Sequence, residues 1–496
     1  MIRFGTTEGA TLTIIQDKNN LRVVGPAQHF HGYKYSDATD DGAYITWSAN
    51  QQEVIIESDP LGLLPYFIYH HKNLTIVSNN LLEMLHLCSS NVSVDWTAMA
   101  IFIRLGHHIG DDTLFGEIKR LPQNSLVTIT PNGLSITPKP SVPFTGTSIK
   151  LSDAVEGYVE IFDKIITDAV QSRDFELIQP LSGGRDSRHI LAALLKAGHP
   201  PNLCITQALP APQRNDDVTI SESICRNLNL RHVVCPPVTN HYKAETYKNS
   251  RISYESMYHA WFCPISVFLE TLPTSVILDG LGGDVLSESK TIKPEYYHLI
   301  QNEPVEVLAN KILGDDTFLK TQINKTFARM LAREPATQRL SDELRKHLGE
   351  PNPLVSFFLN NRTRRSIAPS CWGLFGRRHH VVVPYLARPL RSFLMSLPHD
   401  YHRQGNLHTL AIHHGYPELQ HYEYAGTGPL QPITLPSHLR NIRSSARFNW
   451  NKVQTGMNSP GLTLARMLRN CLSPLDLVNS MTLDRKLNLL RLAYGT

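Results

Sequence analysis

The sequence predicts an α/β protein with a β-rich N-terminal region, a doubly wound parallel sheet and a helical C-terminal part. Three observations support this prediction. Short β-branched and aromatic runs fill residues 1 to about 140, predicted strands and helices alternate from about 150 to 280, and helical spacing dominates beyond about 290. With 496 residues, the chain is long enough for two or three domains.

The N-terminal region contains β-type runs, such as 11–15, 43–47 and 74–78, that are separated by turn residues. Strands of this kind must pair and form layers to be stable. The stretch 138–148 is rich in proline and glycine and predicts a linker. We therefore divide the chain into two domains, 1–148 and 149–496.

Strand and helix patterns alternate after the linker. An amphipathic helix is predicted from Ser152, and four apolar runs, at 175–181, 202–209, 231–235 and 274–280, are typical of buried strands. The intervening segments 187–198, 216–230 and 258–272 have helical spacing. This alternation favours a parallel sheet covered by helices on both faces, and such sheets bind ligands at the carboxyl ends of their strands.

Composition limits the classes of partner. The net charge of +4 is the difference between 48 basic and 44 acidic residues, so it gives little support to a nucleic-acid partner. The chain has no run of about 18 apolar residues and no N-terminal segment typical of secretion. We therefore expect a cytoplasmic protein without membrane contact. The 7 scattered cysteines predict buried thiols rather than disulfides or a zinc site.

The first candidate site is a glycine turn at the end of the strand predicted at 175–181. Its residues, in the sequence LSGGRDS, are Ser182, Gly183, Gly184, Asp186 and Ser187. Free N–H groups and the positive helix dipole at such a turn suit a phosphate, and the two serine hydroxyls add donors. Asp186 fits an anion site only together with a cation, and Mg²⁺ bridging carboxylate and phosphate would supply it.

A second glycine turn ends the fourth predicted strand. The sequence DGLGGD places Gly280, Gly282 and Gly283 before Asp284, at the same edge of the predicted sheet as the first turn. The two turns together favour a nucleotide and metal site. The alternative is two ordinary tight turns with acids that face solvent.

The two glycine motifs carry a family resemblance. LSGGRDS resembles the pyrophosphate loop of ATP pyrophosphatases, and together with DGLGGD it resembles the synthetase domain of asparagine-synthetase-like proteins. Further likenesses occur in the family's order: SDPLGLLPYFIYHHKNLTIVSN (58–79) and DTLFGEIKRLPQNSLVTITPNG resemble its N-terminal glutaminase domain, and VVVPYLARPLRSFLMSLP resembles a late synthetase segment. Together these segments cover most of residues 40–420.

The resemblance implies an Ntn-type glutamine-amidotransferase-like domain followed by a synthetase domain that uses ATP and Mg²⁺. Family members join a carboxylate to AMP, release pyrophosphate and form an amide with an amine. Carried over, Ser182, Gly183, Gly184 and Ser187 would hold pyrophosphate. Asp186 and Asp284 would hold Mg²⁺, and Gly280, Gly282 and Gly283 would line the adenylate.

The sequence departs from the family at several positions. Glutamine-dependent members have a nucleophilic Cys at position 2, where this chain has Ile2, so a glutaminase is not expected and the first domain resembles a degenerate remnant. Leu281 stands where asparagine synthetases have Glu, and only Arg403 or His408 could replace a Lys of the late synthetase region. We interpret both as ordinary surface residues. Arg185 and Arg188 are further departures, and could add positive charge near phosphates or pair with a substrate acid.

Three functions therefore stay open. The first is an AMP-forming amide ligase for a specialised carboxylate of a peptide, small-metabolite or sugar-acid pathway, with the β-lactam synthetase and lasso-peptide cyclase branches as similar cases. The second is an asparagine synthetase that uses ammonia or a partner glutaminase. The third is an inactive nucleotide-binding pseudoenzyme. A pathway partner protein or a homo-oligomer fits each of them, and a tRNA-modifying enzyme is disfavoured because no paired-cysteine motif is present.

Overall fold

A computed structural model describes residues 2–454, except 37–38, 89–90, 142, 172–174, 289–290, 317–318, 320–322, 404–405 and 427, together with nine scattered positions beyond 454. The predicted helices near 462–472 and 484–495 lie largely outside the described residues. Cys471 is also outside them. The other six cysteines are buried free thiols, as the sequence predicts.

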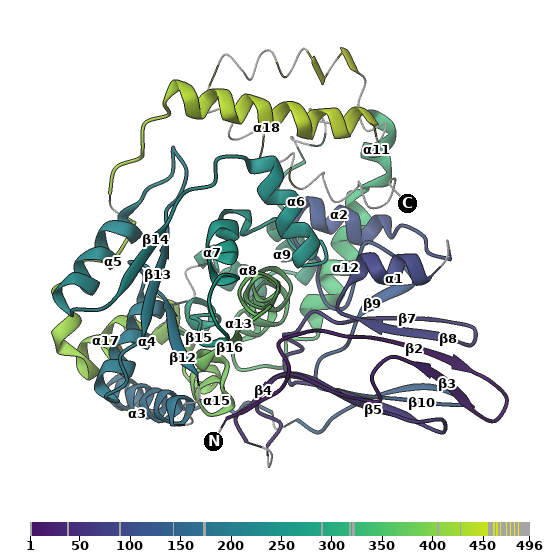
Figure 1. Cartoon of the computed structure of the whole chain (residues 1–496), viewed down its shortest axis with the longest axis horizontal. Coiled ribbons are helices and arrows are strands. Elements are labelled where there is room, and N and C mark those ends of the chain that lie inside the picture. Colours follow the sequence, from purple (N-terminus) through teal and green to yellow (C-terminus); the bar gives the residue numbers. More distant parts are fainter. Residues whose placement is uncertain are drawn as a thin grey trace.

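A five-stranded parallel sheet forms the centre of the second region (Figure 1). Its order is β14-β13-β12-β15-β16, and the strands are β12 (Glu176–Pro180), β13 (Leu203–Gln207), β14 (His232–Cys235), β15 (Ser275–Leu278) and β16 (His380–Val382). All four pairings are parallel. The predicted parallel sheet is confirmed, with β16 as a fifth strand that the sequence pattern missed.

Strand order places a topological switch point between β12 and β15. The chain runs outward through β12, β13 and β14, then returns to the other side of β12 as β15. Right-handed crossovers therefore put α4 (Arg185–Lys196) and α5 (Asp216–Asn227) on one face, and α6 (His241–Arg251) and α7 (Cys263–Leu269) on the other. Crevices at such switch points bind ligands.

The helix predicted over 258–272 is shorter in the structure. A 3₁₀ turn, η1 (Ala260–Phe262), precedes α7, and Pro264 stands in the first turn of α7. His259 has a left-handed φ of 71°. A non-glycine residue in this conformation breaks an α-helix, so the helical run cannot begin at 258.

The N-terminal region consists of two antiparallel sheets (Figure 1). One has the order β1-β4-β5-β6-β10-β11 and the other β3-β2-β8-β7-β9. The strands are β1 (Arg3–Phe4), β2 (Thr11–Gln16), β3 (Leu21–Val24), β4 (Gln28–Lys34), β5 (Gly42–Ala49), β6 (Val54–Ser58), β7 (Phe67–His71), β8 (Leu74–Ser78), β9 (Ile118–Arg120), β10 (Ser125–Thr130) and β11 (Gly133–Pro138). The predicted β-rich region is confirmed.

Helices α1 (Leu81–Leu87) and α2 (Trp96–Leu105) also belong to this region. The boundary predicted near 148 falls between β11 and α3 (Leu151–Val170).

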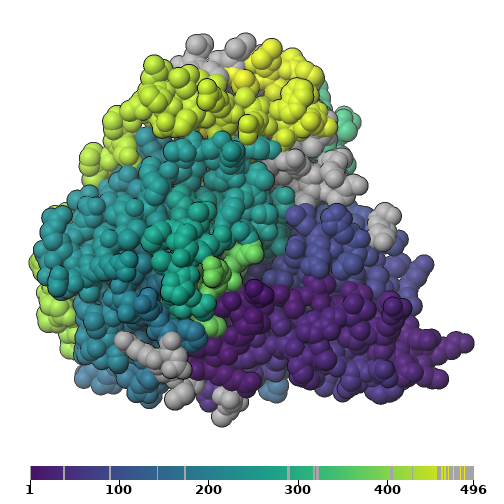
Figure 2. All heavy atoms as spheres, viewed as in Figure 1, coloured from purple at the N-terminus to yellow at the C-terminus, as the bar shows by residue number. Residues whose placement is uncertain are grey.

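The C-terminal part is helical, as predicted. It contains α8 (Pro294–Asn302), α9 (Val305–Leu313), α11 (Lys325–Met330), α12 (Arg333–Arg345), α13 (Pro353–Phe358), α14 (Ala368–Ser370), α15 (Arg388–Ser396), α16 (His399–Arg403), α17 (Asn406–Gly415) and α18 (Leu435–Gln454). Short turns are η5 (Pro384–Leu386) and η6 (Pro417–Leu419), and three π-helical segments are η2 (Asp284–Glu288), η3 (Leu359–Ile367) and η4 (Cys371–Phe375). Figure 2 shows α18, in yellow-green, lying across the top of the teal α/β part.

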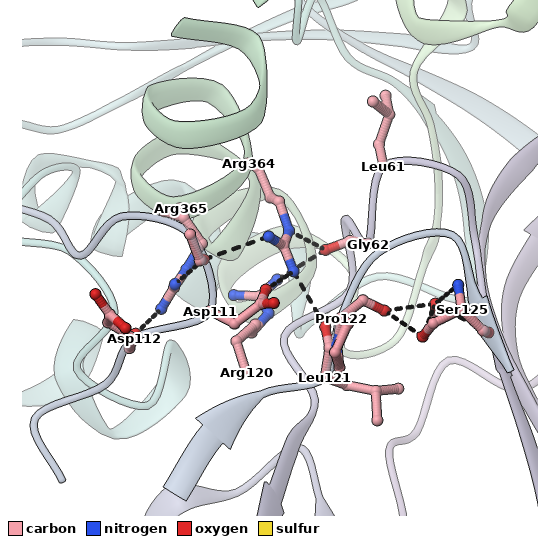
Figure 3. A network of polar contacts seen from close by, with 12 residues as sticks. Leu61, Gly62, Asp111, Asp112, Arg120, Leu121, Pro122, Ser125, Arg364 and Arg365 are labelled. Carbon is pink, nitrogen blue, oxygen red and sulfur yellow. Dashed lines mark hydrogen bonds and ion pairs between the residues drawn. The ribbon is translucent and has the colours of Figure 1, made fainter. Parts of the chain in front are cut away.

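Buried arginines fasten the N-terminal region to η3 (Figure 3). Arg364 donates to the carbonyls of Gly62 and Leu121 and pairs with Asp111 at 2.8 Å. Arg365 donates to the carbonyl of Asp112 at 2.8 Å. These bonds satisfy carbonyls that lie between the strands of the first region, so the two regions share one buried polar interface.

An ion triad lies beside this interface. Glu255 pairs with Arg365 at 2.8 Å and with Arg120, and all three side chains are buried. Burial alone would raise the pKa of Glu255, but the guanidinium groups of Arg365 and Arg120 lower it to about 2. The carboxylate is therefore charged at neutral pH.

In the described residues, no helix combines the length and apolarity needed to span a bilayer.

Candidate functional site

The two glycine turns meet at the switch point. Ser182, Gly183 and Gly184 connect β12 to α4, and Gly280 to Gly283 follow β15, which pairs with β12. A Cβ atom on Gly280 would stand 2.9 Å from the Cβ of Asp186, and one on Gly283 would stand 2.5 Å from its Cγ. Asp186 of the first turn therefore lies directly against the glycines of the second.

The first turn is closed by its own hydrogen bonds. The Ser182 and Ser187 hydroxyls lie 3.0 Å apart, the Ser182 N–H donates to the Ser187 hydroxyl, and the Gly184 N–H donates to that of Ser182. The Gly183 N–H donates to a carboxylate oxygen of Asp217, from α5, at 2.8 Å. Burial raises the pKa of Asp217, and the Gly183 hydrogen bond opposes this shift. Sequence reasoning missed Asp217.

Residues 422–426, here called the strap, cover the first turn. The Ala425 N–H donates to the Gly183 carbonyl at 3.0 Å, and a Cβ on Gly183 would stand 2.8 Å from that of Ala425. The guanidinium groups of Arg185 and Arg188 lie 4.0 and 4.2 Å from the centre of the Tyr424 ring. The strap thus holds both arginines by cation–π contacts.

The structure gives Arg185 and Arg188 different surroundings. Arg188 is buried and donates to the carbonyls of Tyr422 and Glu423. Arg185 donates to the Thr409 hydroxyl at 2.7 Å. The hydrogen bonds of Arg188 therefore connect the strap to α4. Arg185 is only half-buried and lies nearer to the surface.

The second turn is closely packed and internally hydrogen-bonded. Asp279 accepts the Leu281 N–H at 2.8 Å and lies 3.5 Å from the Cys371 thiol, and burial raises the pKa of Asp279. Gly282 has a φ of +94°, which disfavours any side chain, and a Cβ there would also clash with Leu386. Leu281 is 4% exposed and offers no proton acceptor.

A cavity of 270 Å³ opens at the second turn. Asp186 and Asp284 both line it, so the structure brings together the two acids that the sequence singled out. The cavity is lined by Asp186, His259, Trp261, Phe262, Asp279, Gly280, Leu281, Gly282, Asp284, Val285, Arg362, Thr363, Ile367, Ser370, Cys371 and Phe375. This lining does not include Ser182, Gly183, Gly184, Ser187 or Gly283.

The three π-helical segments of the described chain, η2, η3 and η4, all contribute to this cavity. Segments of this kind are rare and occur frequently at functional sites. Arg362 of η3 lies 3.9 Å from Asp284 of η2. Sequence reasoning missed Arg362, since an isolated arginine in a helical run gives no local signal.

A buried polar network contacts Asp186. His408 of α17 lies 3.5 Å from the Asp186 carboxylate, 3.1 Å from the Ser287 hydroxyl and 3.1 Å from His189. The Tyr385 hydroxyl donates to the Asp186 carbonyl at 3.1 Å. The interpretation of His408 as a surface residue was wrong: its side chain is fully buried, because α17 packs against α3 and α4.

The two carboxylates at the cavity fit a metal ion whose other ligands come mainly from a substrate. No group of three or more His, Cys, Asp or Glu side chains arranged to hold a metal occurs in the described part of the chain. Asp186 and Asp284 supply two carboxylates that face one cavity, with 29% and 33% of their side chains exposed. Mg²⁺ commonly takes one or two carboxylates and completes its shell with phosphate and water.

The N-terminal region offers no nucleophile at position 2. Ile2 is 5% exposed and belongs to the hydrophobic core.

A larger cavity of 790 Å³ lies between this region and the second one, and its walls include His31, Glu83, Arg251 and Arg378. Tyr66, behind His31, bonds both His31 and His29 at 3.0 Å.

Comparisons with known proteins give no family. No family model matches the chain, and no curated protein matches it. One similar solved structure is the allosteric regulatory enzyme of purine biosynthesis, at 9% identity and a TM-score of 0.15, covering 40% of this chain and 47% of that one. Another is the glutamine phosphoribosylpyrophosphate amidotransferase from B. subtilis complexed with ADP and GMP, at 9% and 0.14, covering 49% and 44%. The chain thus spans less than half the length of each.

Proposed function

We propose that this protein is an ATP-dependent ligase that adenylates a carboxylate, releases pyrophosphate and forms an amide with an amine. One observation carries the proposal: Asp186 of the first glycine turn lies against Gly280 and Gly283 of the second, at the switch point of a parallel sheet. This arrangement puts a helix N-terminus, two acids and a cavity at one edge, where a nucleotide and its metal can bind together.

The roles follow from position. Ser182, Gly183, Gly184 and Ser187 lie at the N-terminus of α4 and would bind the pyrophosphate part of ATP. Gly280, Gly282 and Gly283 would line the adenylate, and the lack of side chains at Gly280 and Gly283 leaves room for Asp186 beside it. Asp186 and Asp284 would hold Mg²⁺, which when bound neutralises charge on the phosphates.

The proposed reaction needs no reactant other than ATP, the carboxylate and the amine. A substrate carboxylate oxygen attacks the α-phosphorus, and the bond to the β,γ-phosphates breaks to release pyrophosphate. The amine then attacks the acyl carbon, AMP leaves, and the amine proton passes to solvent. The chain would orient the carboxylate toward the α-phosphate, and the first glycine turn would stabilise the leaving pyrophosphate.

We further propose that the N-terminal region is a structural, glutaminase-like remnant. The buried Ile2 supports this assignment, since it supplies neither thiol nor hydroxyl. The amine would then come from solution or from a partner protein. An asparagine synthetase fits less well, because Leu281 cannot accept a proton from ammonia.

A second candidate is a nucleotide-binding protein without ligase chemistry. It is favoured by one observation: the N–H groups of Ser182, Gly183 and Gly184 all have partners within the chain. For ATP to use these donors, the turn must exchange the Asp217 carboxylate and the serine hydroxyls for phosphate oxygens.

Pyrophosphate release from ATP and Mg²⁺ tests the proposed function. We expect release that depends on an added carboxylate and an amine and that is lost in Asp186→Asn. Asp168→Asn is the matched control, since 46% of the Asp168 side chain is exposed and the residue pairs with Lys164 on α3, outside the cavity lining. ATP binding without release for a broad panel of acids would favour the second candidate instead.

A further inference from the structure

The cavity at the second glycine turn is lined by both acidic and apolar residues. The acids are Asp186, Asp279 and Asp284. The apolar residues are the aromatic Trp261, Phe262 and Phe375, with Leu281, Val285 and Ile367. A small-molecule site typically combines an apolar wall with a few polar groups that fix orientation.

The aromatic rings form one packed wall. Trp261 and Phe262 have ring centroids 3.8 Å apart at an interplanar angle of 32°, and Phe262 meets Phe375 edge-on at 5.1 Å. Trp261 and Phe262 are half-buried, so part of this apolar surface is open to a ligand. Covering it with an apolar body would remove apolar surface from water and so favour binding.

Arg362 supplies the positive charge. Among the described residues that line the cavity, it alone carries a guanidinium or an ammonium group. Its nearest acid is Asp284 at 3.9 Å, which is longer than a hydrogen bond, and 32% of its side chain is exposed. The neighbouring Arg364 and Arg365 of η3 are instead engaged with the N-terminal region. Arg362 is therefore the cation of this lining that can pair with an anionic ligand.

We infer that the carboxylate substrate is a monocarboxylic acid with an apolar or aromatic body, bound through its carboxylate to Arg362 and through its body to Trp261, Phe262 and Phe375. This inference rests on the proposed function and deepens it. A guanidinium can hold a carboxylate by two parallel hydrogen bonds, which orients the group for attack on ATP.

Charge and size both exclude other acids. A dicarboxylate such as aspartate would place its second carboxylate among Asp186, Asp279 and Asp284, where Mg²⁺ already shares its charge with these acids and the phosphates and no second guanidinium or ammonium of the described lining can pair with it. The volume of 270 Å³ lies just below the range of about 300–1,000 Å³ that is usual for small-molecule pockets. The pocket therefore accepts a body of amino-acid size, either free or at the end of a longer chain.

The test compares 3-phenylpropanoate with L-aspartate. Exchange of labelled pyrophosphate into ATP should be at least about tenfold more efficient with 3-phenylpropanoate, given the cost of an unpaired buried charge. In Arg362→Gln, the KM for the acid should rise roughly tenfold to a hundredfold, as expected on losing a charged hydrogen bond, while the KM for ATP stays within about twofold. Arg345→Gln, at an exposed pair on α12, is the matched control.

A binding measurement distinguishes a failure of this inference from a failure of the proposed function. We expect 3-phenylpropanoate to change the intrinsic fluorescence of the wild type and not that of Trp261→Phe, which keeps an aromatic ring. Better exchange with aspartate would overturn this inference and leave the proposed function standing. Binding that requires Arg362, without exchange for any acid, would keep the pocket assignment and overturn adenylation. Neither binding nor exchange of 3-phenylpropanoate would overturn the inference.

Discussion

The carboxyl group of Asp186 occupies the space next to Gly283, where a Cβ would stand 2.5 Å from its Cγ and Oδ1 atoms. Contacts this short do not occur between real atoms, so the position requires glycine while Asp186 keeps its place. The close approach joins a turn after β12 to a turn after β15, about a hundred residues later in the chain.

Gly283→Ala should therefore displace Asp186 and weaken Mg²⁺-dependent ATP binding. We expect an affinity loss of about tenfold or more, comparable to removing a charged contact. Gly349→Ala is the matched control, because a Cβ there meets nothing within 4 Å. Calorimetric titration with ATP and Mg²⁺ measures the effect, and equal affinities of the two variants would contradict it.

His408 should act as a positioning residue for Asp186. His408→Ala removes the imidazole 3.5 Å from the carboxylate and should raise the Mg²⁺ concentration required for half-maximal exchange by about 10- to 100-fold, as for other groups that orient a metal ligand. His408→Gln should restore part of this loss because it still hydrogen-bonds. The exposed His414, on the same helix α17, gives the control His414→Ala.

A structural role alone would lower the melting temperature of His408→Ala but leave the Mg²⁺ requirement of the folded fraction unchanged. The two readouts therefore separate positioning from folding.

Asp217 should compete with phosphate at the first turn. Asp217→Asn keeps the shape of the side chain and an acceptor for the Gly183 N–H, but it removes a negative charge from the anion site. The ATP dissociation constant should fall about fivefold, since like charges near the surface repel by about 1 kcal/mol or more. Glu222→Gln, an exposed change on the same helix α5, serves as control. Weaker ATP binding by Asp217→Asn would identify Asp217 as a brace of the turn instead.

The buried triad at the interface should make the fold sensitive to the loss of one charge. Glu255→Gln leaves Arg120 and Arg365 without a counter-ion and should lower the free energy of unfolding by about 3–5 kcal/mol. Glu306→Gln, at an exposed pair with Arg345, should cost about 0–1 kcal/mol. Denaturant unfolding measures both changes.

The same triad should make the stability of the fold depend on pH in the acid range. Because the pKa of Glu255 is lowered from 4.5 to about 2, its ion pairs stabilise the fold fully above pH 4.5, and this contribution disappears as the pH falls toward 2. Glu255→Gln should lack this component of acid unfolding. A wild-type melting temperature that changes with pH in this window no more than that of the variant would refute the assignment.

The sequence predicted the strand, turn and helix around Ser182 because each has a local signal: an apolar run, two glycines and an amphipathic repeat. Local signals for α1 and α2 were overlooked. Asn80 and Asp95 both cap these helices with their side chains, but short helices inside a strand-rich region were hidden by the strand pattern. Strand β16 has only three residues, and its pairing with β15 spans about a hundred residues, so the valine run at 381–383 does not by itself indicate a fifth parallel strand.

The candidate site was predictable only in part, for the same reason. The glycines and the two acids carry motifs, whereas Arg362, His408 and the strap reach the site through the packing of η3, α17 and the segment after η6. Their positions depend on contacts between distant segments. The burial of His408 in particular follows from the packing of α17 on α3, which periodicity alone does not reveal.

The most direct test of the central claim is calorimetric ATP binding with and without Mg²⁺, in the wild type and in Asp186→Asn. The account predicts that Mg²⁺ strengthens ATP binding to the wild type and has little effect on the variant, because the carboxylate that shares the metal with the phosphates is gone. Absence of ATP binding to the wild type, or the same response to Mg²⁺ in both proteins, would contradict the assignment of the two glycine turns as one nucleotide and metal site.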